Sequence, residues 1–378
     1  MAGEWSRTDF PSIYVQTLLR DGKTSKRYKV SYRDRSGKVT SKTLPSLNEA
    51  KRYKRGLENA RDEGLLPDLT LSRKTMEELW DHFGASWDKK PSTLARYGWA
   101  WQGQIAPVFG SRRIGSIQKS ELVKFFSDVE ETKSRDARRK TQMLVHKLFA
   151  FAMHEDWLQR NPADNISAPV PERKEARFLT EEELKRVAEA MPERYGALVW
   201  TLGVTGLRIG EALALRVKNV DGNIRVVENS VEFSFPSEMP TQSSSGTVVG
   251  TPKSRSSRRV VPIPPGLLQM LKDHMTTYSN VFDPETLVFT ASNGARIRQS
   301  NFRHQFQAAC LRVGIEPTPK VHDLRHTAAS LMLKIGLQPF EVAKLLGHSN
   351  SGLVESLYGH LYESHLQAKV DLMGDVLG

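Results

Sequence analysis

Two short segments that cannot continue a helix or a central strand divide this chain and limit what it can fold into. Residues 66–71 read Leu-Pro-Asp-Leu-Thr-Leu, and residues 167–176 contain two prolines among small and charged residues. Proline lacks the backbone N–H that regular structure needs, so such segments are typical of linkers. The 378 residues are therefore expected to form three domains, over residues 1–65, 72–166 and 177–378.

The positive charge of the chain is concentrated in the first of these regions. The formal net charge is +12, and residues 20–55 alone hold 13 Lys and Arg against three Asp and Glu. Such a surplus indicates a polyanionic partner, either nucleic acid or an anionic membrane surface. No apolar run approaches the roughly 18 residues of a membrane span. The N-terminus lacks the apolar core of a signal peptide, and the single Cys310 excludes a disulfide framework, so we expect an intracellular protein without a membrane partner.

The basic first region carries the pattern of a small sheet followed by a helix. Three runs alternate with β-branched and aromatic residues, at residues 12–19, 26–33 and 38–43. A capping box at Ser46 and Glu49 predicts a helix that extends to about residue 62. A basic sheet face can enter a DNA groove, although a merely solvated sheet would have the same composition. The cations expected to contact DNA here are Lys26, Arg27, Lys29, Arg33 and Arg35.

The middle region is helical throughout. Apolar residues recur at three- and four-residue spacing over residues 75–87, 92–109, 119–131 and 134–156, which predicts a four-helix bundle. Arg138 and Arg139 open the last of these helices and could contact phosphates. A solvated helix face is the alternative for both.

The third region mixes helices with short strands. A capping box at Thr180 and Glu183 starts a helix, a second helix is expected over residues 194–204, and residues 223–263 favour strands. A Ser-, Pro- and Thr-rich loop at residues 236–246 interrupts the strands, either as a surface insertion or as a contact to DNA or a partner. The chain as a whole is thus expected to be multidomain and mainly α, with small β-sheets.

Four segments of the third region carry side chains suited to phosphodiester chemistry. Together they supply two arginines, a lysine, two histidines and a tyrosine, namely Arg208, Arg325, Lys253, His322, His348 and Tyr358. Arginine offers planar paired donors to phosphate oxygens, and fixed cations stabilise the charge that gathers there during displacement. A tyrosine hydroxyl, with a pKa of about 10, needs a nearby base or positive potential before it can attack. No cluster of carboxylates accompanies the set, so two-metal chemistry is not indicated.

The ordered set resembles the tyrosine recombinases of the phage-integrase type. The family pattern places Arg in a Thr-Gly-x-Arg-x-x-Glu segment, Lys in a hairpin, His-x-x-Arg, Leu-Gly-His and then Tyr, and Thr205–Glu211, Lys253, His322–Arg325, Leu346–His348 and Tyr358 match in that order. The resemblance implies a heterobivalent enzyme. Its residues 1–65 would bind arm-type DNA, 72–166 would be the SAM-like bundle that binds core sites, and 177–378 would be the mixed α/β catalytic domain.

The resemblance also implies a role for each matching residue. Tyr358 would attack the phosphate, forming a 3′-phosphotyrosyl link and freeing a 5′-hydroxyl. Arg208 and Arg325 would hold the non-bridging oxygens, and Lys253 would protonate the leaving oxygen. His322 would assist proton transfer from the tyrosine, and His348 would donate a hydrogen bond to the phosphate. Glu211 would orient the arginines. No metal, ATP or other cofactor is implied.

Some assignments leave a competitor open. Tyr362 lies four residues after Tyr358, and its spacing from His348 fits the family less well. Lys253 competes with its neighbours Arg255, Arg258 and Arg259, which we expect to contact the DNA backbone. The amphipathic tail at residues 364–377 is expected to dock on a neighbouring subunit, with docking on its own subunit as the alternative.

The implied function is site-specific recombination. The protein would integrate, and also excise, phage or mobile-element DNA through a Holliday junction, acting as a homotetramer on double-stranded DNA with core-type and arm-type sites. A DNA-bending host factor and a directionality factor are the expected accessory proteins, and the bacterial cytoplasm and its nucleoid the expected location. The alternative with the same chemistry is a type IB topoisomerase-like enzyme that relaxes DNA without exchanging strands.

Overall fold

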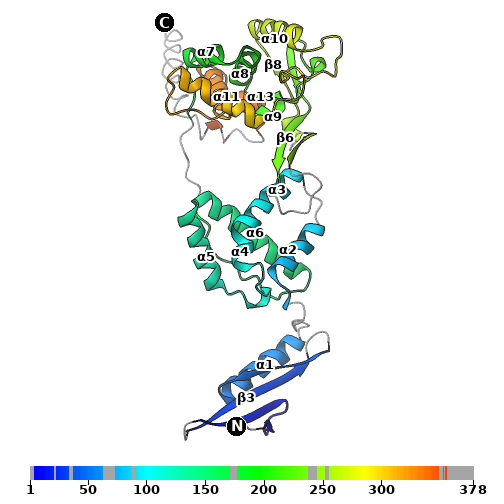
Figure 1. Ribbon diagram of the computed structural model, residues 1–378, viewed down its shortest axis with the longest axis vertical. Coiled ribbons are helices and arrows are strands. Elements are labelled where there is room, and N and C mark those ends of the chain that lie inside the picture. The colour runs from blue at the N-terminus through cyan, green and yellow to red at the C-terminus, as the bar shows by residue number, and fades with distance from the viewer. Residues whose placement is uncertain are drawn as a thin grey trace, which may run out of the picture. The chain divides into compact units, whose positions relative to one another are not determined.

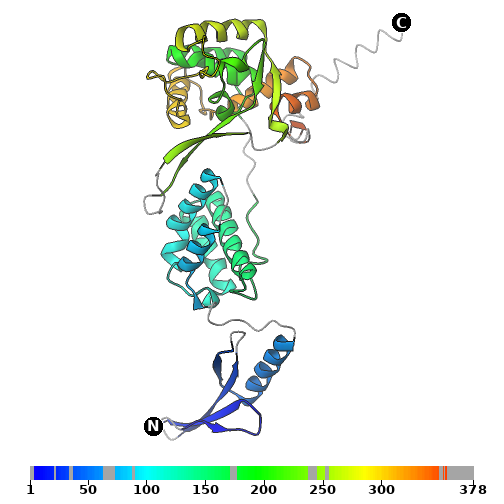
Figure 2. The same cartoon turned by 90° about the vertical axis from the view of Figure 1, so that its right-hand side faces the viewer.

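The computed structural model describes most of the chain (Figure 1, Figure 2). The described residues are 4–20, 23–33, 37–62, 73–86, 90–170, 177–236, 245–251, 255–348, 352, 354 and 355. Four residues named above lie outside these ranges, namely Arg35, Lys253, Tyr358 and Tyr362, as do the tail and most of the loop at 236–246. The chain forms two compact units, the first over Met1–Glu172 and the second over most of the rest.

The N-terminal residues form an antiparallel sheet with the strand order β1-β2-β3-β4. The strands are β1 (Ser6–Arg7), β2 (Ile13–Arg20), β3 (Lys23–Arg33) and β4 (Val39–Leu44). Strands β2, β3 and β4 match the three runs predicted from alternation. The sheet has one strand more than the three that were expected. The additional strand β1 pairs only two residues with β2, which is too short for any period to reveal.

Helix α1 (Leu47–Asp62) covers one face of this sheet. Ile13, Val30 and Ala50 are fully buried between the two layers. The predicted cap is present, because the Ser46 hydroxyl accepts a hydrogen bond from the Glu49 N–H at 3.3 Å. Since side chains alternate along a strand, the neighbours of Val30 in β3 project from the opposite, open face.

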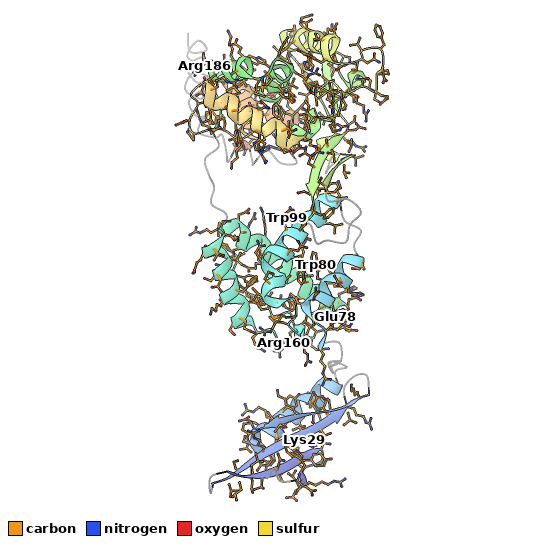
Figure 3. The ribbon with its side chains drawn as sticks, in the orientation of Figure 1. Lys29, Glu78, Trp80, Trp99, Arg160 and Arg186 are labelled. Atoms are coloured by element: carbon orange, nitrogen blue, oxygen red, sulfur yellow. The ribbon has the colours of Figure 1, made fainter. Side chains whose placement is uncertain are left out.

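The middle residues form the predicted bundle. Its helices are α2 (Met76–Ala85), α3 (Pro91–Ala100), α4 (Ala106–Phe109), α5 (Lys119–Thr132) and α6 (Arg135–His154). The helix expected over 92–109 is irregular, because a π-helical turn at Trp101–Ile105 joins α3 to α4. Pro107, at the start of α4, has no N–H to donate to the preceding turn, which accounts for the local change of hydrogen-bond pattern. Trp80, which Figure 3 labels, stacks on Trp101 with ring centroids 4.9 Å apart.

The second unit contains helices around two small antiparallel sheets. The helices are α7 (Glu181–Ala190), α8 (Glu193–Thr205), α9 (Ile209–Ala212), α10 (Pro265–Tyr278), α11 (Gln299–Arg312), α12 (Asp323–Lys334) and α13 (Pro339–Leu346). The strands are β5 (Asn223–Val226), β6 (Asn229–Ser234), β7 (Ser245–Gly250) and β8 (Arg259–Pro262), with β5 paired to β8 and β6 to β7. One core lies around α7, α8, α10 and α11, and a smaller one between α12 and α13. Among the helices that the structure describes, none combines the length and hydropathy that crossing a membrane requires.

The bundle core predicts a clear asymmetry between two residues of α5. Phe126 is fully buried, whereas Val123 on the same helix is 48% exposed. We expect Phe126→Ala to lower the free energy of unfolding of the first unit by about 3–5 kcal/mol, because it leaves a cavity. Val123→Ala should change it by less than about 0.5 kcal/mol. Urea denaturation followed by tryptophan fluorescence measures both, and equal losses would show that α5 does not pack as described.

Candidate active site

A tight turn places the first arginine of the site. Helix α8 ends at Thr205, and Gly206 follows in the left-handed region with φ 65°. A Cβ at Gly206 would lie 2.3 Å from the Leu346 Cδ2 atom, so this position needs glycine both for its backbone angle and for the close packing of α13. The chain then turns directly into Arg208, which precedes α9. This explains why glycine comes two residues before arginine in the sequence motif.

A buried carboxylate holds Arg208. The side chain of Glu211 is 2% exposed, and its Oε1 atom accepts from Arg208 Nη1 at 2.8 Å. Its Oε2 atom accepts from the Arg208 backbone N–H at 2.9 Å. The Arg208 side chain itself is 37% exposed, so the guanidinium is anchored on one side and open to solvent on another.

Arg259 holds the same carboxylate from the other side, which corrects its expected role as a DNA contact. Its Nη1 and Nη2 atoms donate to Glu211 Oε1 and Oε2 at 3.2 and 3.0 Å, and its Nε donates to the Leu345 carbonyl oxygen. The Arg259 side chain is only 6% exposed. Arg259 shares a face of β8 with the buried Val261, two residues on, and that alternation is the sequence signal that could have separated it from Arg258.

Burial and ion pairing act against each other on Glu211. Burial alone would raise the pKa of this carboxyl group, but the hydrogen bond and charge of Arg259, followed by those of Arg208, outweigh it and hold the pKa below its usual value. Glu211 is therefore charged at neutral pH and neutralises one of its two arginines.

Arg325 fixes the end of α13 in a similar way. It is 4% exposed, and its Nη1 and Nη2 atoms donate to the carbonyl oxygens of Gly206 and Leu346, both at 2.7 Å. Arg259 and Arg325 thus bind consecutive carbonyl groups at the negative end of one helix, where cations are stabilised. Gly347, with φ 72°, ends the helix and leads into His348.

His348 lies in a strongly positive environment. Burial lowers its pKa to about 4, and the charges of Arg325, Arg208, Arg259 and His322 add to that effect. His348 is therefore neutral at physiological pH and can donate one N–H. Within the described part of the chain, its Nδ1 atom is buried and has no hydrogen-bond partner.

His322 and His326 lie together at the start of α12. Their rings are 5.3 Å apart, edge to face. Burial, followed by the charges of His326 and Arg325, lowers the pKa of His322, although its side chain keeps access to solvent. A neutral imidazole at this place can accept a proton, which His322 would have to do as a base.

The expected DNA contacts separate by face. The alternation of side chains along β3 places Arg27, Lys29 and Arg33 on its open face. Lys26 lies on the helix-covered face, with Val30. These four cations therefore do not form a single DNA-binding surface. Figure 3 labels Lys29, whose Nζ lies 4.6 Å from the centre of the Trp5 ring.

The arginines of the other two regions also differ from one another. Arg138 is tied to Glu130 at 2.6 Å and to the Ser167 carbonyl at 3.2 Å, so its guanidinium has partners within the bundle rather than a free face for DNA. Arg139 is 48% exposed and Arg258 is exposed, so both remain available to phosphates. The Arg255 side chain lies outside the described residues.

The arrangement therefore collects cations and neutral imidazoles and uses its one buried carboxylate to orient them. The charges of Arg208 and Arg325 lower the pKa values of both His322 and His348, so these four side chains lie near one another. Among the described residues, no group of three or more His, Cys, Asp or Glu side chains is arranged to hold a metal ion. Such a group of cations and neutral imidazoles can bind an anion and stabilise additional negative charge on it.

Comparison with known proteins agrees with this chemistry. Residues 177–365 match the phage integrase family, and residues 73–168 match the phage integrase central domain. The chain is 26% identical to a tyrosine recombinase XerC-like protein of Caldanaerobacter subterraneus, over 95% of this chain and 98% of that protein.

Two solved structures share the fold. The Tn1549 transposon integrase in complex with transposon right end DNA superposes with a TM-score of 0.64 at 17% identity, over 80% of this chain and all of that one. The lambda integrase tetramer bound to a Holliday junction superposes with a TM-score of 0.58 at 16% identity, over 93% of this chain and 96% of that one.

The double pairing of Glu211 predicts a large cost for removing Arg259. We expect Arg259→Gln to lower the free energy of unfolding of the second unit by about 3 kcal/mol, because a buried carboxylate loses its main partner. Arg258→Gln, one residue away and exposed, should leave the denaturation midpoint unchanged and weaken DNA binding instead. If both variants unfold at the wild-type denaturant concentration, the buried pair does not stabilise the fold.

The lowered pKa of His348 predicts a pH dependence of stability. The unfolded chain binds this proton at about pH 6.5, whereas the folded chain binds it only at about pH 4. The stabilisation that comes from the neutral His348 is therefore complete above about pH 6.5 and is lost as the pH falls towards about 4. We expect His348→Asn to flatten this part of the stability curve, measured by urea denaturation at several pH values. An equally steep fall in the variant would contradict the assignment, and His304→Asn, at an exposed site of α11, is the matched control.

Proposed function

Because this chain belongs to the phage integrase family and is a tyrosine site-specific recombinase, we propose that Tyr358 attacks a DNA phosphate bound in the cleft of Arg208 and Arg325. The observation that carries this proposal is that both arginines lie close enough to His322 and His348 to lower their pKa values, while Arg208 is anchored on the buried Glu211. The comparisons favour recombination over the topoisomerase-like alternative.

In the proposed reaction, His322 accepts the proton of the Tyr358 hydroxyl as the tyrosyl oxygen bonds to phosphorus. The bond from phosphorus to the 5′-oxygen breaks, and Lys253 gives that oxygen its proton. The guanidinium groups bind the non-bridging oxygens most strongly when these carry the extra charge of the transition state. The neutral His348 donates a hydrogen bond to one of them. The 5′-hydroxyl of a partner strand then reverses these steps, so the phosphodiester energy is kept and ATP is not required.

Arg208 and Arg325 enter this scheme in different ways. Arg208 is oriented by Glu211 and partly exposed, so it can close on a phosphate without losing its anchor. Arg325 is buried and bound to two carbonyl groups, so it also fixes the backbone next to the bound phosphate. Pre-organised donors of this kind lower the cost of rearrangement during the reaction.

The three domains divide the DNA contacts among them. Residues 1–65 would bind arm-type sites through the open face of the sheet, residues 72–166 would bind core sites, and residues 177–378 would carry out catalysis. The family matches over 73–168 and 177–365 support the last two boundaries. The cations on the open face of β3 support the first.

We extend the proposal to the assembly. The lambda integrase structure is a tetramer on a Holliday junction, which supports a homotetramer here that integrates and excises phage or mobile-element DNA. The tail at 364–377 would dock on a neighbouring subunit. A DNA-bending host factor and a directionality factor would assist on the nucleoid in the bacterial cytoplasm.

The decisive test is covalent trapping. Wild-type protein, incubated with nicked attachment-site DNA whose cleaved end diffuses away, should accumulate a protein–DNA adduct that denaturing gels resolve. We expect Tyr358→Phe to abolish the adduct, because phenylalanine has no nucleophilic oxygen. Tyr362→Phe, four residues on, should keep it. Adduct formation by Tyr358→Phe, or its loss only in Tyr362→Phe, would overturn the assignment of the nucleophile.

A further inference from the structure

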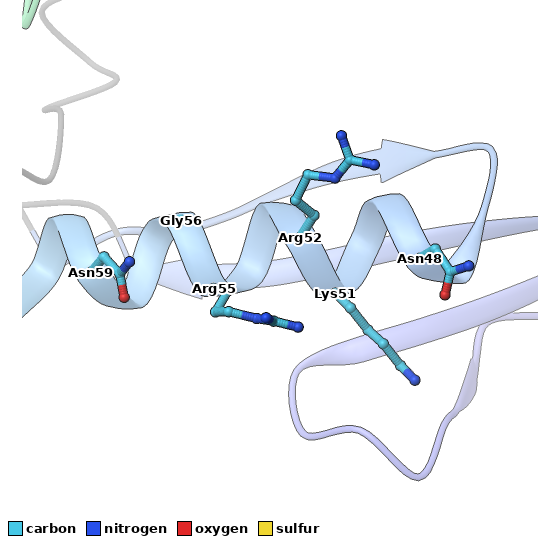
Figure 4. Close-up of a pocket in the computed structure, with 6 residues that line it drawn as sticks. All are labelled: Asn48, Lys51, Arg52, Arg55, Gly56 and Asn59. Carbon is cyan, nitrogen blue, oxygen red and sulfur yellow. The ribbon is translucent and has the colours of Figure 1, made fainter.

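The outer face of α1 carries a stripe of polar and basic side chains that the proposed chemistry does not use. Asn48, Arg52, Arg55 and Asn59 recur at intervals of four, three and four residues, so they lie along one side of the helix. Lys51 and Gly56 border them, and the six residues line a shallow groove (Figure 4). We refer to these six residues as the α1 stripe. It faces away from the side of α1 that packs on the sheet through Ala50, Tyr53 and Leu57.

The α1 stripe is strongly cationic and contains no acid. None of its six residues is Asp or Glu, and the nearby Glu58 pairs with Lys54, on the flank of the helix, at 3.3 Å. Lys51 is held in place, because its Nζ lies 3.6 Å from the centre of the Phe10 ring. The stripe therefore presents a positive surface to solvent, and one of its three cations is anchored.

Gly56 leaves room for another molecule beside the α1 stripe. A Cβ added there would meet nothing within 4 Å, so the fold itself does not require glycine at this position. Glycine weakens a helix relative to alanine, since it loses more backbone entropy on folding. What glycine offers in the middle of an exposed stripe is room for close approach to the helix backbone.

The stripe and the open face of the sheet point in opposite directions. Arg27, Lys29 and Arg33 lie on the open face, with the sheet and then α1 behind them. The major groove of a duplex is about 8.5 Å deep, so the sheet alone can fill it. A helix of about 10–12 Å diameter that lies behind the sheet then remains outside the groove. The same stretch of DNA cannot therefore contact both faces.

We propose that the α1 stripe binds the phosphate backbone of a second duplex, so that this small N-terminal domain joins two DNA segments back to back. This rests on the proposed function in one respect, the binding of DNA by the open sheet face. The stripe covers 12 residues, from Asn48 to Asn59, which is about 17 Å of helix and the axial rise of about five base pairs of DNA. Arginine and asparagine donate readily to phosphate oxygens. The stripe lacks the aromatic and aliphatic anchors on which protein interfaces depend, which favours DNA over an acidic protein.

The test is a bridging assay with the full-length protein. One long random-sequence duplex is immobilised on beads, a second with a fluorescent label is added, and its retention is measured over a range of salt concentrations. We expect Arg52→Gln/Arg55→Gln to bind the immobilised duplex as the wild type does, but to retain less of the labelled duplex, down to the level that the DNA-binding residues 72–378 supply. The slope of log retention against log salt should fall by about 1.8 for two lost phosphate contacts.

Three further variants make the outcome specific. Lys185→Gln/Lys272→Gln removes the same charge from exposed sites of α7 and α10 and should bridge normally. Gly56→Leu keeps every charge, favours the helix and obstructs the groove, so it should also impair bridging. Wild-type bridging by both the Arg52→Gln/Arg55→Gln and the Gly56→Leu proteins would overturn the inference.

The last variant separates this inference from the function on which it rests. Arg27→Gln/Arg33→Gln should weaken capture of the protein by the immobilised duplex. If that capture is unchanged, the DNA-binding role of the sheet face fails. If it weakens while the α1 variants bridge normally, only the second DNA site fails.

Discussion

The cleft of the second unit depends on one buried carboxylate held between two guanidinium groups. A charged Glu211 would be too costly to bury alone, and its burial is compensated because Arg208 and Arg259 approach both oxygens. These contacts connect the start of α9 with β8, and the bond from Arg259 to the Leu345 carbonyl extends the connection to α13. Glu211 thus fixes elements that are distant in sequence to one another. It also orients Arg208, which remains partly exposed.

The positive potential of this cleft has a second effect, on the histidines. Burial lowers the pKa values of His348 and His322, and the nearby cations lower them further because they disfavour protonation. The site therefore keeps permanent charge on arginine, which cannot be deprotonated, and keeps imidazoles in the form that can both accept and donate. Charge stabilisation and proton transfer are in this way assigned to different residue types.

Much of this could be predicted from the sequence, and the failures have identifiable physical causes. Long amphipathic helices and the caps at Ser46 and Thr180 were predictable because their signals are local. The motif residues around Arg208 and Arg325 were predictable because the order of short segments is itself specific. By contrast, β1 is too short to show a period, and the π-helical turn at Trp101–Ile105 depends on one proline within an otherwise regular pattern.

The role of Arg259 could not be recognised for a different reason. In the sequence it is one of several neighbouring cations, and only strand register and a carbonyl 86 residues away distinguish it from Arg258. The same applies to Lys26 and Arg27, adjacent residues that the sheet sends to opposite faces. Charge can be counted in a sequence, but the side of an element on which it lies depends on partners that are far along the chain.

The clamped end of α13 also sets a limit on where the proposed nucleophile, Tyr358, can act. Arg259 and Arg325 fix the carbonyl groups of Leu345 and Leu346, so the chain beyond Gly347 starts from an anchored point. Tyr358 lies ten positions after His348, and a fully extended chain of ten steps reaches at most about 36 Å between the two Cα atoms. This length limits how far from Arg259 and Arg325 the phosphate attacked by Tyr358 can lie. The limit holds whether that phosphate is bound by the same subunit or by a neighbour.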